Sequence, residues 1–388
     1  MELIAFASGL PPEDSELMTA LCEAENRACA SLRKGRTADA GERSGLRKGR
    51  ASEAERADGL GYRPLRERLC ERLAARGLRA EPDRLLLTSG PLQTLELYAR
   101  TMAAAGGAVL VEHPACAQSL ETLRSCGLEP VAPDSDGDGM GPEAAESLLK
   151  RSKPAFLLAA PTAGSPIGRN WSLERRLALL ALARRYGVPI LEDDSYGVLA
   201  FDPAAACPTL YELDGGLGTV LYTGGFPRAV TPELRTGWAL GEDRVIRRMA
   251  GGMRWPADLQ AQLAADVLLR DYALDGRMWE LTALYRARME ALHALLLANR
   301  RSGMRWVVPD GGLFLWLELP EALDAEALLR NALRKGVSFA PGAAFFASIP
   351  RRNTARLNFA AVRGDDMEAG VLRLVAAADD FLARAAYD

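Results

Sequence analysis

Three acidic residues, a serine and a tyrosine come directly after a short apolar segment, VPIL at 188–191, in the sequence EDDSY at 192–196. A carboxylate at the end of a buried strand can hold a protonated heteroaromatic nitrogen, and Tyr196, three residues after Asp193, can hydrogen-bond a phenolic oxygen on the same ring. The simpler alternative is that an acidic residue caps a helix while Tyr196 packs in the core. The pattern alone leaves both interpretations open.

A Ser-Gly turn, Ser89-Gly90, follows another apolar segment and opens a predicted helix over 91–103. The free N–H groups at the N-terminus of a helix, together with the helix dipole, attract anions. Most connections of this kind are only turns, so the turn by itself is weak evidence for a phosphate site.

Arginines lie at two further places, after one predicted strand and within another. Arg228 and Arg235 follow the apolar segment 219–223, and Arg356 lies in a predicted strand at 355–359. A guanidinium binds a carboxylate through two parallel hydrogen bonds, so Arg356 is a candidate carboxylate clamp. The alternative for Arg356 is an ordinary surface ion pair.

The segments that must position these residues alternate between short apolar runs and helical patterns. Helices are predicted over 63–77 and 173–186, and the strand candidates are 84–88, 107–111, 155–159, 188–191, 219–223 and 237–241. This alternation predicts an α/β fold with a mostly parallel central sheet that is covered on both faces. Such sheets bind ligands at the carboxyl ends of their strands, which is where the candidate residues lie.

The alternation of short apolar runs and helical patterns ends near residue 275. A long helix over 277–300, a strand at 311–320 and a helix at 324–335 predict a smaller α+β domain over 276–388, after a large α/β domain over 59–275. Residues 1–58 form an N-terminal segment in which LRKGRTADAGERSG at 32–45 is nearly repeated at 46–59. The repeat is polar and charged, so we expect an exposed linker or arm there.

Composition excludes several classes of function. The net charge is −3 over 388 residues, and no apolar run is long enough to span a bilayer, so neither a nucleic-acid nor a membrane partner is expected. The six cysteines contain no CxxC and there are only two histidines, so we expect free thiols, no metal and a cytoplasmic protein. Lysine is scarce, with five residues: Lys34, Lys48, Lys150, Lys153 and Lys335.

Taken together, the motifs identify a family. The chain resembles the fold-type I aminotransferases that use pyridoxal phosphate (PLP), especially the aminotransferase domain of MocR-like regulators, although no winged-helix segment is expected before Met1. The motifs are Gly9-Leu10-Pro11, Gly61-Tyr62-Arg63-Pro64-Leu65-Arg66, Thr88-Ser89-Gly90, Pro166-Ile167-Gly168, Glu192-Asp193-Asp194, Thr231-Pro232-Glu233-Leu234-Arg235, Gly311-Gly312-Leu313-Phe314-Leu315-Trp316 and Arg356-Leu357-Asn358-Phe359.

The resemblance implies a role for each matching residue. Asp193 would pair with the pyridine nitrogen and Tyr196 would hydrogen-bond the ring hydroxyl. The phosphate would be bound by Ser89, Gly90 and Arg235. Arg356 and Gly9 would bind the amino-acid substrate, with Arg356 holding its α-carboxylate. The resemblance also implies a homodimer.

The sequence departs from the family pattern at the position that matters most for chemistry. Arg228 stands where the family has the lysine that forms an imine with PLP, and a guanidinium neither forms that imine nor acts as a ready base. Other departures are Gly225 for a Ser or Thr, Pro227 before the lysine position, Ser165 for an Asn, Cys116 for the stacking aromatic, Pro91 for a residue with an N–H, and the lack of any tyrosine before Tyr62. Each of these weakens the expected binding of PLP or pyridoxamine phosphate (PMP).

Three interpretations remain at this point. The first is an aminotransferase-like protein that does not transaminate and binds a small anionic or amino-acid-like ligand in the former PLP pocket. The second is an enzyme that needs no lysine and uses PMP or a preformed aldimine. The third is a conventional PLP-dependent aminotransferase in which another lysine takes over, although Lys150 and Lys153 precede a strand and Lys335 belongs to the smaller domain.

Overall fold

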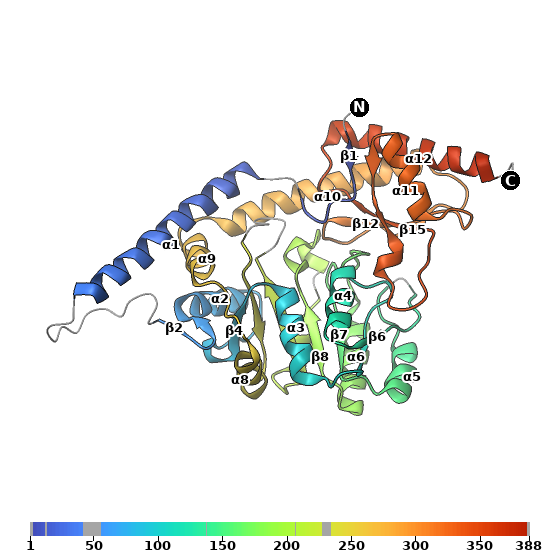
Figure 1. The fold of residues 1–388 in the computed structure, drawn as a ribbon. Coiled ribbons are helices and arrows are strands. Elements are labelled where there is room, and N and C mark those ends of the chain that lie inside the picture. The colour runs from blue at the N-terminus through green and yellow to red at the C-terminus, as the bar shows by residue number, and fades with distance from the viewer. Residues whose placement is uncertain are drawn as a thin grey trace.

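The computed structural model describes residues 3–11, 14–41, 56–136, 138–205, 207–226 and 234–385 (Figure 1). Its centre is a seven-stranded sheet in the order β4-β10-β9-β8-β7-β5-β6. The strands are β4 Leu85–Thr88, β5 Ala108–Leu110, β6 Glu129–Val131, β7 Phe156–Ala159, β8 Ile190–Asp193, β9 Val220–Gly225 and β10 Gly237–Leu240. β10 runs antiparallel to both of its neighbours, and the other neighbouring pairs are parallel. The predicted α/β fold with a mostly parallel sheet is confirmed.

Two hydrophobic clusters cover the two faces of this sheet. Successive strand residues alternate between them: Leu85 and Leu87 belong to the larger cluster, while Leu86 belongs to the smaller one. This alternation follows from the two-residue period of a strand, and it explains why buried strands are apolar without interruption. The covering helices are α2 Arg63–Ala75, α3 Pro91–Met102, α4 Ala117–Ser125, α5 Pro142–Ser152, α6 Leu173–Tyr186, α7 Leu210–Asp214, α8 Asp243–Gly252 and α9 Leu259–Asp271.

Local sequence explains where these helices begin and end. The hydroxyl of Ser172 accepts a hydrogen bond from the N–H of Arg175 and so caps the start of α6. At the other end, Gly187 adopts φ of 64°, the left-handed conformation that terminates a helix. Val188 and Pro189 complete this turn, so β8 begins at Ile190, two residues later than predicted. Asp193 is therefore the last residue of the strand itself.

A smaller second sheet has the order β11-β12-β15-β14. Its strands are β11 Arg305–Trp306, β12 Phe314–Glu318, β14 Ala340–Pro341 and β15 Thr354–Asn358, with helices α11 Ala325–Arg334 and α12 Gly364–Ala385 beside it. The N-terminal strand β1 Ile4–Ala5 runs parallel to β13 Val337–Ser338, so the first residues of the chain lie with this sheet. A hairpin of β2 Ala57–Asp58 and β3 Gly61–Tyr62 precedes α2.

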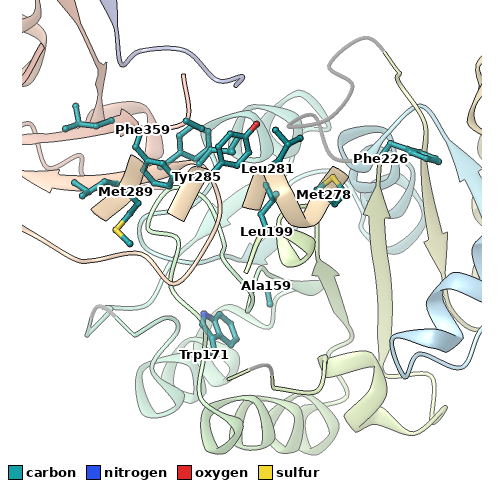
Figure 2. Packing of buried hydrophobic residues seen from close by; sticks show 14 of the residues in the cluster. Ala159, Trp171, Leu199, Phe226, Met278, Leu281, Tyr285, Met289 and Phe359 are labelled. Atoms are coloured by element: carbon teal, nitrogen blue, oxygen red, sulfur yellow. The ribbon is translucent and has the colours of Figure 1, made fainter. Parts of the chain in front are cut away.

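The long helix α10 Leu274–Ala298 connects the two parts of the molecule, and the predicted boundary at 275/276 falls in its first turn. Its buried side chains Met278, Leu281, Tyr285 and Met289 belong to the same apolar cluster as Leu199 of the large sheet region and Phe359 of the small one (Figure 2). One continuous core therefore supports both sheets.

The N-terminal repeat differs from the prediction in its first copy. We expected a linker from residue 32, but helix α1 Ser15–Gly41 continues through this segment and packs along α9 (Figure 1). Arg, Lys and Ala favour helices, and Leu32 packs against the core, which accounts for the difference. Residues 42–55, which hold most of the second copy, lie outside the described residues. Within the described part, no helix is long and apolar enough to span a bilayer.

Candidate functional site

A cavity of about 430 Å³ lies at the edge of the central sheet where the parallel strands end. It is lined by residues that follow β4, β5, β7 and β8, by the end of β9, and by the residues that lead into β10. Seven residues predicted for the site line this one cavity: Ser89, Gly90, Cys116, Ser165, Asp193, Tyr196 and Arg235. They come from positions 89 to 235, so only the fold brings them together.

Asp193 is the acidic residue of the EDDSY motif that faces the cavity. Its Oδ1 accepts hydrogen bonds from the N–H of Ser195, at 3.0 Å, and from the Ser195 hydroxyl. Burial raises the pKa of Asp193, while the bonds from Ser195 oppose the rise. Tyr196 also lines the cavity and packs edge-on against Phe314 of β12, with ring centroids 5.9 Å apart. Asp193 therefore stabilises a turn and also presents its carboxyl group to the cavity, so its geometry is compatible with both initial interpretations of the motif.

The two neighbours of Asp193 point elsewhere. Glu192 is buried and accepts hydrogen bonds from the N–H groups of Leu210 and Tyr211, at 2.8 and 2.9 Å, at the start of α7. Burial and the charge of Asp194 raise the pKa of Glu192 to about 8. Asp194 accepts a hydrogen bond from the Arg76 guanidinium at 3.0 Å and another from the Tyr222 hydroxyl at 2.6 Å. These two acids hold α7, α2 and β9 against β8.

The Ser89-Gly90 turn, predicted as an anion site, lies at the start of α3. Gly90 has φ of 116°, which only glycine adopts without strain. The first helical residue is Pro91, which has no N–H, and the side-chain oxygen of Gln93 accepts the N–H of Ser89 at 2.7 Å. The free N–H groups of the first helical turn therefore begin at Leu92. Arg235 lies beside this turn, and among the described residues it has no ion-pair partner.

The lining residues that sequence reasoning missed include Glu112 and Thr236. Glu112 directly follows the β5 segment, so the rule that pointed to Asp193 also applied to it. Its Oε1 accepts the N–H of Ala160 at 2.6 Å, and burial together with the charge of Asp193 raises its pKa to about 8. Thr236 is only 2% exposed, and its Oγ1 has no hydrogen-bond partner among the residues that the structure describes. The same is true of the buried Oγ of Ser165, which also lies at the cavity.

Arg356 and Gly9 do not line this cavity but lie beside it. A Cβ built on Gly9 would lie 3.9 Å from Nη2 of Arg356. Asn358 donates hydrogen bonds to the carbonyls of Ser8 and Leu10 and so holds this loop in place. Burial lowers the pKa of Arg356, while Tyr196 and Cys116 of the cavity act in the opposite direction.

The environment of Arg356 is aromatic. The guanidinium lies 3.9 Å from the ring centroid of Phe314 and 5.0 Å from that of Phe345. Within the described ranges, its buried Nε has no hydrogen-bond partner and no carboxylate lies within ion-pair distance. The surface ion pair considered for Arg356 is not found among the described residues.

Arg228, which the sequence analysis assigns to the position of the family's lysine, lies outside the described residues. Of the lysines whose side chains the structure describes, none lines the cavity. Lys150 forms an ion pair with Glu146 on α5, and Lys335 forms one with Asp380 on α12. Across the described ranges, no group of three or more His, Cys, Asp or Glu residues is placed to hold a metal ion.

The residues around the cavity fit PLP or PMP in part. The Asp193 carboxyl suits a pyridine nitrogen, and the orphaned hydroxyls of Ser165 and Thr236 suit a polar ligand. Ser89, Gly90 and Arg235 suit a phosphate. The pyridine ring of the cofactor would find no aromatic side chain to stack on at position 116, because the lining residue there is Cys116.

Comparisons with known proteins agree with this architecture. The family model described as aminotransferase class I and II matches residues 3–374, so the chain belongs to this family. The 2-aminoadipate transaminase of Thermus thermophilus is 31% identical over 328 residues, which cover 83% of this chain and 81% of that protein. An uncharacterized HTH-type transcriptional regulator of Bacillus subtilis, YisV, is 29% identical over 80% of this chain and 64% of its own length.

Solved structures show the same likeness. The α-aminoadipate aminotransferase LysN of Thermus thermophilus, complexed with N-(5'-phosphopyridoxyl)-L-leucine, is 29% identical with a TM-score of 0.81, covering 98% of this chain and 93% of that one. The kynurenine aminotransferase of Pyrococcus horikoshii, in complex with PMP, is 27% identical with a TM-score of 0.83, covering 98% of this chain and 91% of that one. The resemblance to PLP-dependent fold-type I aminotransferases, including the regulator branch, is confirmed.

Proposed function

We propose that this member of the aminotransferase family binds a small anionic or amino-acid-like ligand in the site cavity and does not carry out conventional transamination. The observation that carries the proposal is the chemistry of the cavity wall. In the described part of the chain it combines Arg235 without an ion-pair partner, the hydroxyls of Ser165 and Thr236 without hydrogen-bond partners, and the carboxyl of Asp193, with no lysine among the lining residues. Such a set suits a charged polar ligand and offers no imine-forming amine.

The sequence at position 228 supports the same proposal. The resemblance places the imine-forming lysine there, and the residue is Arg228. A guanidinium remains protonated and delocalised, so it can pair with an anion but cannot replace the amine or move the proton as a base. Arg228 is thus proposed as a non-catalytic residue.

Weakened cofactor binding is the second part of the proposal. Pro91 removes one N–H from the start of α3, Gly225 brings no hydroxyl, and Cys116 offers no ring to stack on a pyridine. Each lost hydrogen bond costs about 1 kcal/mol. PLP or PMP that does bind would be held by Asp193, Tyr196 and the group around Arg235.

One alternative has a specific observation in its favour. Asp193, Tyr196 and Arg235 line the same cavity, which is the set that a lysine-independent enzyme using PMP would need. PMP already carries an amine, so such an enzyme requires no internal imine. A conventional aminotransferase has less support, since Lys150 and Lys335 are engaged in ion pairs on α5 and α11–α12.

The test is an absorbance titration of the purified chain with PLP and then with PMP. The proposal expects weak or no saturable binding, and no adduct that borohydride fixes to the protein. A saturable band with PMP alone, without a fixed adduct, would instead support the lysine-independent enzyme. A borohydride-fixed PLP adduct would refute both, and peptide mass spectrometry would identify the lysine.

The remaining parts of the proposal concern the protein's surroundings. We propose that the protein is a cytoplasmic homodimer. Its binding partner is a small molecule, not a nucleic acid or a membrane. Net charge of −3 and the resemblance to the family support these statements.

A further inference from the structure

One thiol lies in the wall of the site cavity. Cys116 is partly exposed, and its side chain does not cap the helix that it precedes. Among the described residues that line this cavity it is the only cysteine. A partly exposed thiol in a cavity wall can meet a small reagent that enters the cavity, so its reactivity depends on the charges around it.

The first of these charges belongs to a helix N-terminus. Cys116 is the N-cap residue of the nine-residue helix α4, and Gln118 and Ser119 of the first turn line the same cavity. The N–H groups of a first turn have no partner within the helix, and the helix dipole favours negative charge beside them. This environment favours the thiolate, which is the nucleophilic form of cysteine.

The second charge is a guanidinium. The N–H of Ala115 donates to the carbonyl of Phe345 at 2.9 Å, and the ring centroid of Phe345 lies 5.0 Å from the Arg356 guanidinium. These contacts bring Arg356 close to the start of α4. Burial lowers the pKa of Arg356, while the charges of Tyr196 and Cys116 act to raise it. In the described part of the chain Arg356 has no ion-pair partner, so its charge is available to stabilise the thiolate.

A further observation indicates that the cavity suits an anionic ligand. Thr236 lines it and is 2% exposed, and its Oγ1 has no hydrogen-bond partner among the residues that the structure describes. The exposed Arg235 beside it also lines the cavity and has no described ion-pair partner. Of the two acids on the described wall, Glu112 has a pKa that burial raises to about 8, so it is mostly protonated at pH 7. Asp193 therefore remains as the opposing charge.

Other thiols of the chain have different surroundings. Burial raises the pKa of Cys70 to about 12 and also raises that of Cys126, which makes both of them weak nucleophiles at neutral pH. Cys22 is exposed on α1 and does not line the site cavity, so it serves as a reference thiol in open solvent. Selectivity for Cys116 should therefore come from the charges around it and not from access alone.

We propose that Cys116 is a modification site, at which an anionic disulfide of low molecular weight enters the cavity and forms a mixed disulfide with the protein. The thiol of Cys116 loses its proton to solvent, and the thiolate attacks one sulfur atom of the disulfide. A new S–S bond forms, the old S–S bond breaks, and the other half leaves as a thiolate. The disulfide is the oxidant, and a free thiol reverses the reaction by the same exchange. This site rests on the proposed function in one respect, which is that the cavity attracts anions.

The experiment compares two disulfides on the full chain at pH 7. Dithiobis(nitrobenzoate) is a dianion, whereas dithiodipyridine is neutral at this pH. Quenching with acid and digestion with pepsin preserve mixed disulfides, so mass spectrometry of the peptides gives the rate at each cysteine. We expect the ratio of the anionic to the neutral rate to be at least tenfold higher at Cys116 than at Cys22.

Variants of Arg356 test the source of this preference. Arg356→Gln should lower the ratio at Cys116 at least threefold and leave it unchanged at Cys22, because the guanidinium no longer attracts the anionic reagent. A change of access alone would alter both rates at Cys116 together and leave their ratio constant. Arg356→Lys keeps the charge and should retain most of the preference. Arg248→Gln, an exposed residue of α8, is the matched control and should change neither thiol.

Two outcomes would overturn this assignment, and they differ in what they mean for the proposed function. If Cys116 stays unmodified by both disulfides while Cys22 reacts, there is no modification site, and the proposed function stands because a ligand held by ionic contacts needs no thiol. If Cys116 reacts but shows the same ratio as Cys22, the cavity does not attract anions, and the proposed function is contradicted as well. Circular dichroism of each variant ensures that an altered rate does not reflect a loss of folding.

Discussion

At the scale of single residues, two of the departures from the family pattern are in contact. A Cβ built on Gly225 would lie 3.1 Å from Cδ and 3.3 Å from Cγ of Pro91. A serine or threonine at 225 would therefore press against the proline ring, and the proline would have to give way. A glycine at 225 and a proline at 91 are therefore sterically compatible, whereas a larger residue at 225 would require Pro91 to shift.

The lysine position can be tested by restoring the amine. In Arg228→Lys we expect PLP to form an adduct that borohydride fixes at residue 228, because a lysine, unlike an arginine, forms an imine. Peptide mass spectrometry measures the fixed fraction. Arg248→Lys adds a lysine elsewhere and should trap no more than the unmodified chain. Equal trapping in the two variants would show that residue 228 does not occupy the lysine position.

Glu112 predicts a pH dependence of stability. Its pKa is raised from 4.5 to about 8, so between these values the native state keeps a proton that the unfolded chain has released. Stability therefore falls as the pH rises through this window, by at most about 1.4 kcal/mol for each unit of the shift. In Glu112→Gln there is no proton to release, so unfolding in urea between pH 5 and pH 8 should show a flatter profile. Parallel profiles for the two proteins would contradict this, and the exposed Glu121→Gln is the control.

At the scale of elements, helix α6 holds the loop that carries Ser165. Arg176 of α6 is fully buried, and its guanidinium donates hydrogen bonds to the carbonyls of Pro161 at 2.7 Å, Trp171 at 3.1 Å and Pro208 at 3.3 Å. It also contacts the hydroxyl of Thr162 at 3.0 Å. The loop between β7 and α6 is thus fixed by one side chain at both of its ends.

Removing this side chain should be costly. Arg176→Met keeps much of the apolar volume but leaves several buried carbonyls without donors, at about 1–3 kcal/mol each, so we expect a loss of at least about 3 kcal/mol. Arg185→Met, on the same helix, removes a side chain that is 68% exposed and paired with Glu146, and it should cost under about 1 kcal/mol. Urea unfolding of both variants gives the comparison, and similar losses would refute the structural role of Arg176.

The elements also show how far the sequence could predict the structure. Apolar runs located six of the seven sheet strands, because strands buried on both faces are apolar throughout. The search for apolar runs missed β6, because its sequence, EPV, contains a glutamate and a proline. The rule that ligands lie at strand ends selected residues that line one cavity. Thr236 precedes its strand, which runs antiparallel, and was therefore missed by a search made only after strands.

At the scale of the whole molecule, the site cavity lies where the two sheets meet. Tyr196 packs on Phe314 of β12, the N–H of Ala115 donates to the carbonyl of Phe345 at 2.9 Å, and Arg356 stacks on Phe314 and Phe345. The first residues of the chain join β13, more than 300 residues away. No local pattern encodes pairings of such separation, so the contact between Gly9 and Arg356 rested on the family resemblance alone.

The predicted homodimer belongs to this scale as well. Trp279 of α10 is 73% exposed at the rim of a second cavity, of about 970 Å³, between α2 and α10. A large exposed aromatic beside a hollow is typical of a surface that a partner covers, although single exposed side chains also occur on monomers. Light scattering should therefore give twice the 41.8 kDa of one chain.

A matched pair of variants tests whether this surface forms the dimer. Trp279→Glu places a charge on it and should raise the dissociation constant at least tenfold, because burying an unpaired carboxylate is unfavourable. Leu217→Glu changes a residue that is also 73% exposed but does not line that cavity, and should leave the mass unchanged. Sedimentation velocity over a range of concentrations measures both. A dimer that tolerates Trp279→Glu would place the interface on another face, and a monomer at every concentration would end the dimer prediction.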